Sequence, residues 1–442
     1  MPIKAFFNAK LTLIHMCLLL AVFTYSWEIE GWFRYRIAGF SLRLHQVFFL
    51  FPIAYYLFYC KKNISKIVLP LYVWVGFMFL FIPNSLDLKN AIGYAYLLGF
   101  SVLAMLCIIR FFNSENKIRT LLFTYIFGAL SMSILVIIQF ISFHLGKPIY
   151  EFQNPIMGIL PRVGGFSFEP SAFTRYFIVP FVVTGYLLEK KTALFSKTFL
   201  RNSFVIMFIA FVLTTSRIGI MTALFYVFIR KISNVSRKNL LKNLTLISIL
   251  ILGFGFAYKN NEELISNLFK GINLIESIEK YGSFEAARSG GTSSSLERAS
   301  VAYDAFYGFL ESPIIGTSLG GVDPYYAKKQ GNVYSPALNG LGGGERGGGS
   351  AFAAVLLASG MIALPFFIAF IFRIFVKLRK TIKRANYGHK TVLNALLWGM
   401  FFWMIFRVII DGMHTTEVWI YLGIVIAGIS VYGKQHNFSE VK

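Results

Sequence analysis

Apolar runs about as long as a bilayer is thick recur throughout this 442-residue chain. A transmembrane helix needs about 20 mostly apolar residues to cross about 30 Å of hydrocarbon, and fewer where its polar ends reach the headgroups. Charged residues make up 14% of the chain, against about 25% in soluble domains. The sequence therefore predicts an all-α, polytopic helical membrane protein.

We expect about twelve transmembrane helices. The seventh and eighth runs are short, and one hairpin that enters the bilayer only partway is an alternative for this pair. The first run is followed by Tyr25-Ser26-Trp27-Glu28 rather than by a small-residue cleavage site, so we expect an uncleaved first span. The predicted spans lie near 11–27, 44–60, 67–83, 91–111, 120–144, 171–188, 203–216, 218–230, 243–258, 351–376, 391–410 and 417–432.

The formal net charge of +23 would suit a nucleic-acid-binding protein, but the cations lie mostly in alternate short connections between apolar runs. Lysine and arginine in such loops mark the cytoplasmic side of a membrane protein. The pattern therefore predicts that both termini are cytoplasmic and that no nucleic acid is bound. The cations concerned are Lys61, Lys62, Lys66, Lys117, Arg119, Lys190, Lys191, Lys197, Arg201, Arg230, Lys231, Arg237, Lys238, Lys242, Arg379, Lys380, Lys383, Arg384 and Lys390.

This topology divides the chain into three parts. Residues 1–258 hold the first nine spans and an outward loop at 145–170. Residues 259–350 form a large outward loop, and residues 351–442 hold the last three spans and a cytoplasmic tail. The large loop is the main portion outside the bilayer.

The large loop is expected to be helical. Its leucines and isoleucines between 261 and 280 recur at helical intervals, and Ser294-x-x-Glu297 is a capping box that starts a second helix, with Pro313 just past its end. Both helices look amphipathic and are expected to lie on the membrane or over a cavity.

The glycine-rich stretch 340–349 lacks the Gly-Lys-Ser/Thr ending of a phosphate-binding loop, so no nucleotide site is predicted there. The three cysteines lie in apolar runs without paired spacing and predict neither a disulfide nor a zinc site.

Five arginines fall on the outward side: Arg162, Arg175, Arg217, Arg298 and Arg346. A guanidinium group keeps its charge and binds phosphate through two parallel donors. If several of them meet at one outward cavity, they would suit a diphosphate headgroup whose lipid tail stays in the bilayer. The alternative is that each arginine binds lipid headgroups or neutralises a nearby carboxylate.

Two residues are candidates for proton transfer. Glu169 precedes Pro170, which disfavours helix at position 169 and can open a helix directly after it. The positive end of that helix dipole would favour the ionised carboxylate, which could take a proton from a sugar hydroxyl or simply pair with Arg162 or Arg175. His414, in the last outward turn, could shuttle protons or be an interfacial histidine bonded to a neighbour.

Four features of the chain are shared with one family. They are Arg162-x-x-Gly165-Phe166-x-x-Glu169-Pro170-Ser171 before a span, Thr215-Ser216-Arg217 at a short outward turn, Arg298 followed by Pro313-Ile314-Ile315-Gly316 in a late outward loop, and the layout of about twelve spans. In these features the chain resembles the bacterial O-antigen polymerases (Wzy-type), which share a superfamily with the O-antigen ligases.

The resemblance implies a glycosyltransferase at the periplasmic face of the bacterial inner membrane. Such enzymes transfer a glycan chain from undecaprenyl diphosphate to another lipid-linked repeat unit, with the diphosphate as leaving group and with no nucleotide sugar, metal or cofactor. A partner protein that sets chain length is also implied. Arg162, Arg217 and Arg298 match the phosphate-contacting arginines of the family, and Glu169 matches its acidic motif position.

The chain departs from the ligases at one place. Ligases of the superfamily carry a histidine just before the span that follows the large loop, whereas this chain has Glu345-Arg346-Gly347 there. This difference favours a polymerase over a ligase and leaves Glu169, Glu345 and His414 as alternatives for acid–base chemistry. A flippase for lipid-linked sugars is a third alternative, but it should line its spans with ionisable groups. Here the clearest such groups, Arg373 and Arg407, lie near span ends.

Overall fold

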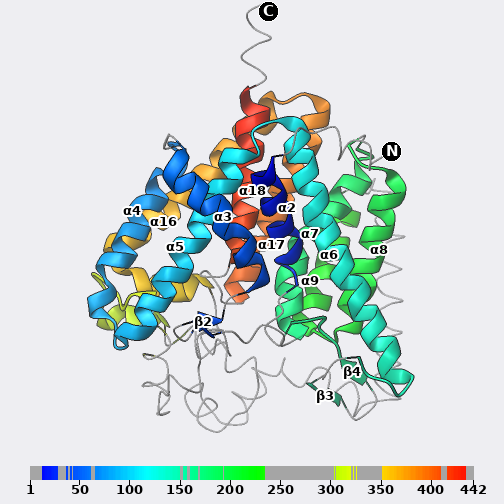
Figure 1. Cartoon of the computed structure of the whole chain (residues 1–442), viewed down its shortest axis with the longest axis horizontal. Helices are drawn as coiled ribbons and strands as arrows, with labels where there is room; N and C mark the ends of the chain where they lie inside the picture. Colours follow the sequence, from blue (N-terminus) through cyan, green and yellow to red (C-terminus); the bar gives the residue numbers. More distant parts are fainter. Residues whose placement is uncertain are drawn as a thin grey trace, which may run out of the picture.

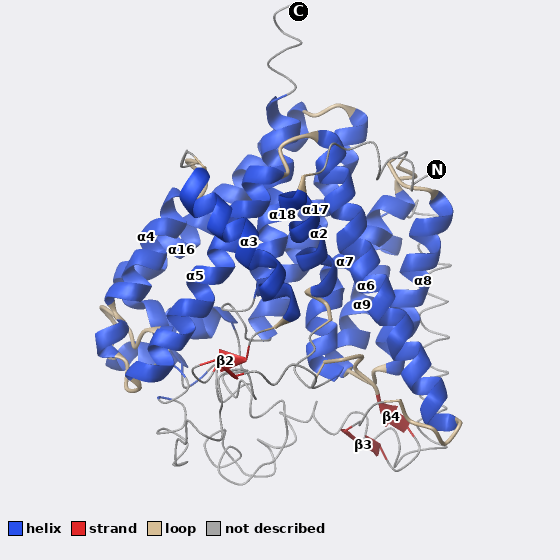
Figure 2. Ribbon diagram, viewed as in Figure 1, coloured by secondary structure: helices blue, strands red, loops and turns tan. Residues whose placement is uncertain are grey.

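The computed structural model describes residues 12–27, 36–37, 40–41, 43–60, 65–149, 153–156, 160–167, 170–192, 194–233, 303, 305–319, 322, 325, 351–409 and 416–434. Within these residues the chain forms a bundle of α-helices with two short β-hairpins at one end (Figures 1 and 2). The helices are α2 (Leu13–Thr24), α3 (Leu44–Tyr59), α4 (Leu69–Leu80), α5 (Leu88–Phe111), α6 (Glu115–His144), α7 (Pro170–Glu189), α8 (Lys197–Leu213), α9 (Arg217–Ser233), α16 (Ala351–Arg384), α17 (Tyr387–Ile409) and α18 (Thr416–Lys434).

The helical class predicted from the apolar runs is confirmed. A helix stands at each predicted span except 243–258, which lies outside the described residues. Four of the described helices, α5, α6, α16 and α18, are long and apolar enough to cross a membrane by length and composition, and several others are shorter apolar helices. The seventh and eighth runs form two separate helices, α8 and α9, of 17 residues each, and both pack along α7.

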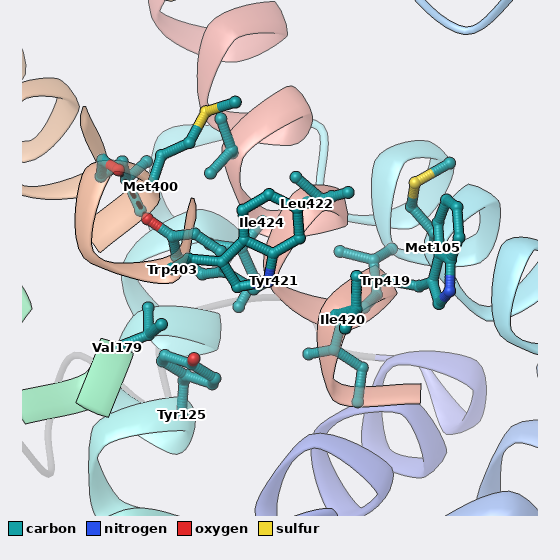
Figure 3. Packing of buried hydrophobic residues seen from close by; sticks show 14 of the residues in the cluster. Met105, Tyr125, Val179, Met400, Trp403, Trp419, Ile420, Tyr421, Leu422 and Ile424 are labelled. Atoms are coloured by element: carbon teal, nitrogen blue, oxygen red, sulfur yellow. Dashed lines mark hydrogen bonds between the residues drawn. The ribbon is translucent and has the colours of Figure 1, made fainter. Parts of the chain in front are cut away.

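Helix α18 lies at the centre of the bundle. It packs against α5, α6, α16 and α17, and Trp419 and Tyr421 are among the largest fully buried side chains. Figure 3 shows these residues with Met105 of α5, Tyr125 of α6 and side chains of α17 around them. The helix can be apolar on all sides because protein surrounds it, as is typical of a buried helix.

The basic connections gather at one end of the bundle, which we call the basic end. The carbonyl of Lys66, before α4, accepts a hydrogen bond of 2.9 Å from Arg373 of α16. Glu115, at the start of α6, pairs with His389, at the start of α17, at 3.2 Å. These contacts join the connections that the sequence predicts to be cytoplasmic.

The opposite end, which we call the hairpin end, carries the β-strands (Figure 1). Strands β1 (Arg36–Ile37) and β2 (Phe40–Ser41) pair antiparallel, and so do β3 (Gln153–Ile156) and β4 (Leu160–Arg162). The sequence predicts an outward loop at 145–170 and no strands. The β3–β4 hairpin is therefore an addition to the prediction, and Arg162 lies at its end.

Helix α16 is broken at Gly360, whose backbone is not helical and has a positive φ of 58° with ψ −173°. Segment 313–318 of the large loop fills the break. The amides of Met361 and Ile362 donate to the carbonyls of Pro313 and Ile314 at 2.7 and 3.1 Å, and the amides of Thr317 and Ser318 donate to Leu357 and Ala358 at 3.0 and 3.2 Å. The segment that follows Pro313, which the sequence assigns to the late loop, is thus joined to α16 by backbone hydrogen bonds.

Candidate functional site

The segment after Arg162 is fixed by a glutamine from α6. Gln139 donates to the carbonyl of Gly165 at 2.8 Å and accepts from its amide at 3.0 Å. Gly165 has φ +66°, and a Cβ at this position would lie 2.5 Å from the methyl group of Met132, so only glycine fits without rearrangement. With Val163 fully buried just before it, the segment holds the partly buried Arg162 at the edge of the bundle.

The starts of α7 and α9 contact each other at the hairpin end. A Cβ at Gly219 of α9 would lie 2.7 Å from Oγ1 of Thr174 on α7, so the absence of a side chain permits this approach. Arg175 follows Thr174 directly and is partly buried, and Arg217 is the first residue of α9. Two of the predicted phosphate-binding arginines therefore stand on neighbouring helix starts.

The Thr215-Ser216-Arg217 motif forms the tight turn between α8 and α9. Thr215 has φ +52°, a left-handed conformation that is uncommon for a β-branched residue. The hydroxyl of Thr214 accepts a hydrogen bond of 3.3 Å from the amide of Ser216, and both residues are buried. The motif therefore fixes where α9 begins and, with it, the backbone position of Arg217.

The other predicted site residues cannot be placed. Glu169, Glu345, Arg346, Arg298 and His414 lie outside the described residues, and of Arg217 only the backbone is described. Within the described chain, Arg162, Arg175 and the start of α9 lie at the same end of the bundle. Their binding of a diphosphate stays a prediction, as do the acid–base roles of Glu169 and His414.

The structure adds buried polar residues inside the bundle that the sequence did not single out. The hydroxyl of Tyr25, just after α2, donates to the carbonyl of Tyr176 on α7 at 3.1 Å, and its ring stacks on Tyr125 at 5.5 Å. Glu417, in the first turn of α18, is only 7% exposed. With Gln139, these residues share one signal in the sequence, namely a polar group near the end of an otherwise apolar run.

The Pro313-Ile314-Ile315-Gly316 motif has a packing role. Gly316 has φ +66°, and a Cβ there would lie 2.5 Å from the carbonyl oxygen of Leu357. Residues 305–311 before it are helical, with Ala305 fully buried and with Phe306 and Leu310 about half exposed. The predicted apolar face of this helix is thus exposed at Phe306 and Leu310, as expected for a helix that lies on a membrane.

The fold and this end of the bundle define a class, the polytopic helical membrane proteins with a polar, arginine-bearing end. Residues 203–346, less than half of the chain, match the family model described as O-antigen ligase. This match confirms the resemblance to the O-antigen polymerase and ligase superfamily for that segment, which contains Arg217 and Arg298. No curated protein matches the chain.

Proposed function

We propose that the protein is a glycosyltransferase that polymerises undecaprenyl-diphosphate-linked repeat units at the periplasmic face of the inner membrane. The observation that carries this proposal is the contact between Thr174 and Gly219. It sets Arg175 and Arg217 on adjacent helix starts, at the end of the bundle where the hairpin presents Arg162. Guanidinium groups that converge from these positions would suit a diphosphate that departs with its lipid tail in the bilayer.

The reaction is a displacement at the anomeric carbon of the donor glycan. A hydroxyl of the acceptor repeat unit attacks this carbon, the bond to the diphosphate oxygen breaks, and the hydroxyl proton passes to a protein carboxylate or imidazole. Glu169 is our first candidate for that base, with Glu345 and His414 as alternatives. The arginines stabilise the charge that grows on the leaving diphosphate, which is where electrostatic catalysis acts most strongly.

The family description names ligases, which transfer a finished chain to lipid A core, and the match by itself does not separate them from polymerases. We favour a polymerase because residues 345–351 contain no histidine. A flippase fits less well. Among the described residues the buried charged side chains are Arg230 and Glu417, and two such groups are too few to line a path for a charged headgroup through the bundle.

The test is the length of glycan made by cells that carry Arg217→Ala. We expect surface glycan with one repeat unit per lipid, and partial recovery with Arg217→Lys, because lysine lacks the paired donors of arginine. Arg201→Ala is the matched control, since Arg201 is an exposed arginine of the preceding helix α8 near the basic end.

The outcomes separate the alternatives. Long chains made by Arg217→Ala would remove this arginine from the mechanism. If cells that carry Arg217→Ala lose all glycan from lipid A core but retain long chains on undecaprenyl diphosphate, this result would identify a ligase instead.

A further inference from the structure

A cavity of about 250 Å³ lies at the basic end, far from the arginines described above. It is bounded by α3, α4, α5 and α18. Ten of the described residues line it: Tyr56, Ser65, Val68, Tyr72, Leu106, Ile109, Arg110, Asn113, Ser430 and Val431.

The lining is divided by polarity. Val68, Leu106 and Val431 are buried apolar side chains and form an inner wall. Ser65, Arg110 and Asn113 stand near or just beyond helix ends at the basic end, and Tyr56 and Tyr72 are hydroxyl-bearing side chains of the same lining. A ligand that fits this cavity must therefore have one polar and one apolar part.

The polar side of the cavity is positively charged. Arg110 is exposed and lines the cavity, and Lys117 reaches it by donating to Oδ1 of Asn113 at 3.4 Å. None of the described residues that line the cavity is Asp or Glu. The nearby carboxylate of Glu115 is paired with His389, so it is already engaged by another cation when that histidine is protonated.

The surroundings of the cavity favour a lipid over a soluble anion. Phe58 and Tyr59, at the end of α3, are 80% and 76% exposed, and Leu69, at the start of α4, is 47% exposed. In a membrane protein such apolar side chains face acyl chains, which would continue from the apolar wall of the cavity. Basic pockets between transmembrane helices on the cytoplasmic side are known to bind anionic headgroups.

We propose that this cavity binds the phosphate headgroup of an anionic glycerophospholipid. Arg110 holds the phosphate, with Lys117 as a second cation, and Ser65 and Asn113 bond the glycerol oxygens. One acyl chain lies along the exposed side of α3. The site is independent of the proposed glycosyl transfer, since it occupies the opposite end of the bundle.

The experiment measures the thermal unfolding of the full chain in nanodiscs of phosphatidylcholine with and without phosphatidylglycerol. We expect phosphatidylglycerol to raise the midpoint, because a ligand that binds only the native state stabilises it. In Arg110→Gln this rise should fall by at least about half. Arg201→Gln removes an exposed arginine of α8 outside the cavity. This control variant should show the full rise of the midpoint.

A second variant, Ser430→Leu, fills the cavity from α18 and leaves every charge in place, and it should also reduce the rise. Bound phosphatidylglycerol counted by native mass spectrometry checks both variants without reference to stability. A full rise in both variants would overturn the proposal. An equal rise with water-soluble sn-glycerol 1-phosphate in phosphatidylcholine nanodiscs would overturn a lipid as the occupant.

Discussion

Single polar side chains decide the local geometry at both ends of this bundle. Gln139 alone satisfies both the amide and the carbonyl of Gly165, and it is 1% exposed. At the basic end, Arg230 of α9 bonds Glu189 of α7 through Nε at 2.7 Å. A buried backbone or charged group without such a partner lowers the stability of the fold. Gln139 and Arg230 should therefore each contribute measurably to the free energy of unfolding.

Gln139→Leu should lower the free energy of unfolding by about 2–3 kcal/mol, because it leaves a buried amide and carbonyl without partners. It should also shorten the glycan, since the segment after Arg162 loses its anchor. Gln139→Glu keeps an acceptor for the amide but sets a buried carboxylate against the carbonyl of Gly165, so it should not restore the stability. Thermal unfolding in detergent and glycan length measure the two effects, and Ile138→Ala, at a neighbouring exposed position, is the control. Unchanged stability in Gln139→Leu would contradict this role.

Arg230→Ala should destabilise the protein by about 2–3 kcal/mol, because it leaves Glu189 without its buried partner. The guanidinium also lies 4.6 Å from the ring centre of Tyr186 and 5.0 Å from that of Trp398, and Ala loses both cation–π contacts. Arg230→Lys should recover only part of the stability, since lysine keeps the charge without the planar group. The thermal midpoint is the measurement, and Lys191→Ala, at an exposed position, should leave it unchanged.

At the scale of elements, the broken helix α16 is the most informative feature. A break in a transmembrane helix exposes amides and carbonyls that lipid cannot satisfy. Here segment 313–318 satisfies them from the large loop, and Trp74 of α4 donates to the hydroxyl of Ser359 at 2.9 Å beside the break. The family motif Pro313-Ile314-Ile315-Gly316 therefore acts as a backbone partner for α16.

Gly316→Ala and Gly360→Ala should each lower the free energy of unfolding by about 2–4 kcal/mol. Both residues have positive φ, and a Cβ at either would lie 2.5 Å from a backbone oxygen of the other segment, so strain and steric overlap combine. Gly388→Ala is the matched control, because its nearest neighbour would lie 3.9 Å away. Monodisperse yield and thermal midpoint in detergent measure the effect, and wild-type values in both variants would show that the two segments separate easily.

At the scale of the whole molecule, the grouping of basic connections at one end agrees with the predicted topology. Contacts between different helices join Lys66 to Arg373, Glu115 to His389 and Glu189 to Arg230 there. The β3–β4 hairpin and the starts of α7 and α9 stand at the other end (Figure 1). The assignment of these ends to the cytoplasm and the periplasm follows from the positive-inside rule and stays a prediction.

Cysteine labelling in intact cells tests this assignment. In a variant without Cys17, Cys60 and Cys107, Lys147→Cys at the hairpin end should react with a membrane-impermeant maleimide. Lys191→Cys at the basic end should react only after the membrane is permeabilised. Both positions are exposed, so burial does not explain a difference. The reverse pattern would invert the topology and place Arg162 and Arg175 on the cytoplasmic side.

The sequence by itself determined the helical class, the positions of the helices and the alternation of basic connections. These features depend on the free energy of placing apolar and charged residues in a bilayer. This free energy depends on the residues of each segment and not on its tertiary contacts. Pro170 and Pro313 also mark helix boundaries that the structure reproduces, because proline is tolerated in the first turn of a helix and disrupts its interior.

Only the tertiary structure decided which polar groups meet. Nothing in the local sequence indicates that Gln139 binds Gly165, that Thr174 lies against Gly219, or that segment 313–318 completes α16. Each of these contacts depends on two segments arriving at the same depth and orientation, and hydrophobicity along the chain does not encode either quantity. The arginines could therefore be chosen from the sequence, whereas the framework that brings Arg175 and Arg217 onto neighbouring helix starts came from packing.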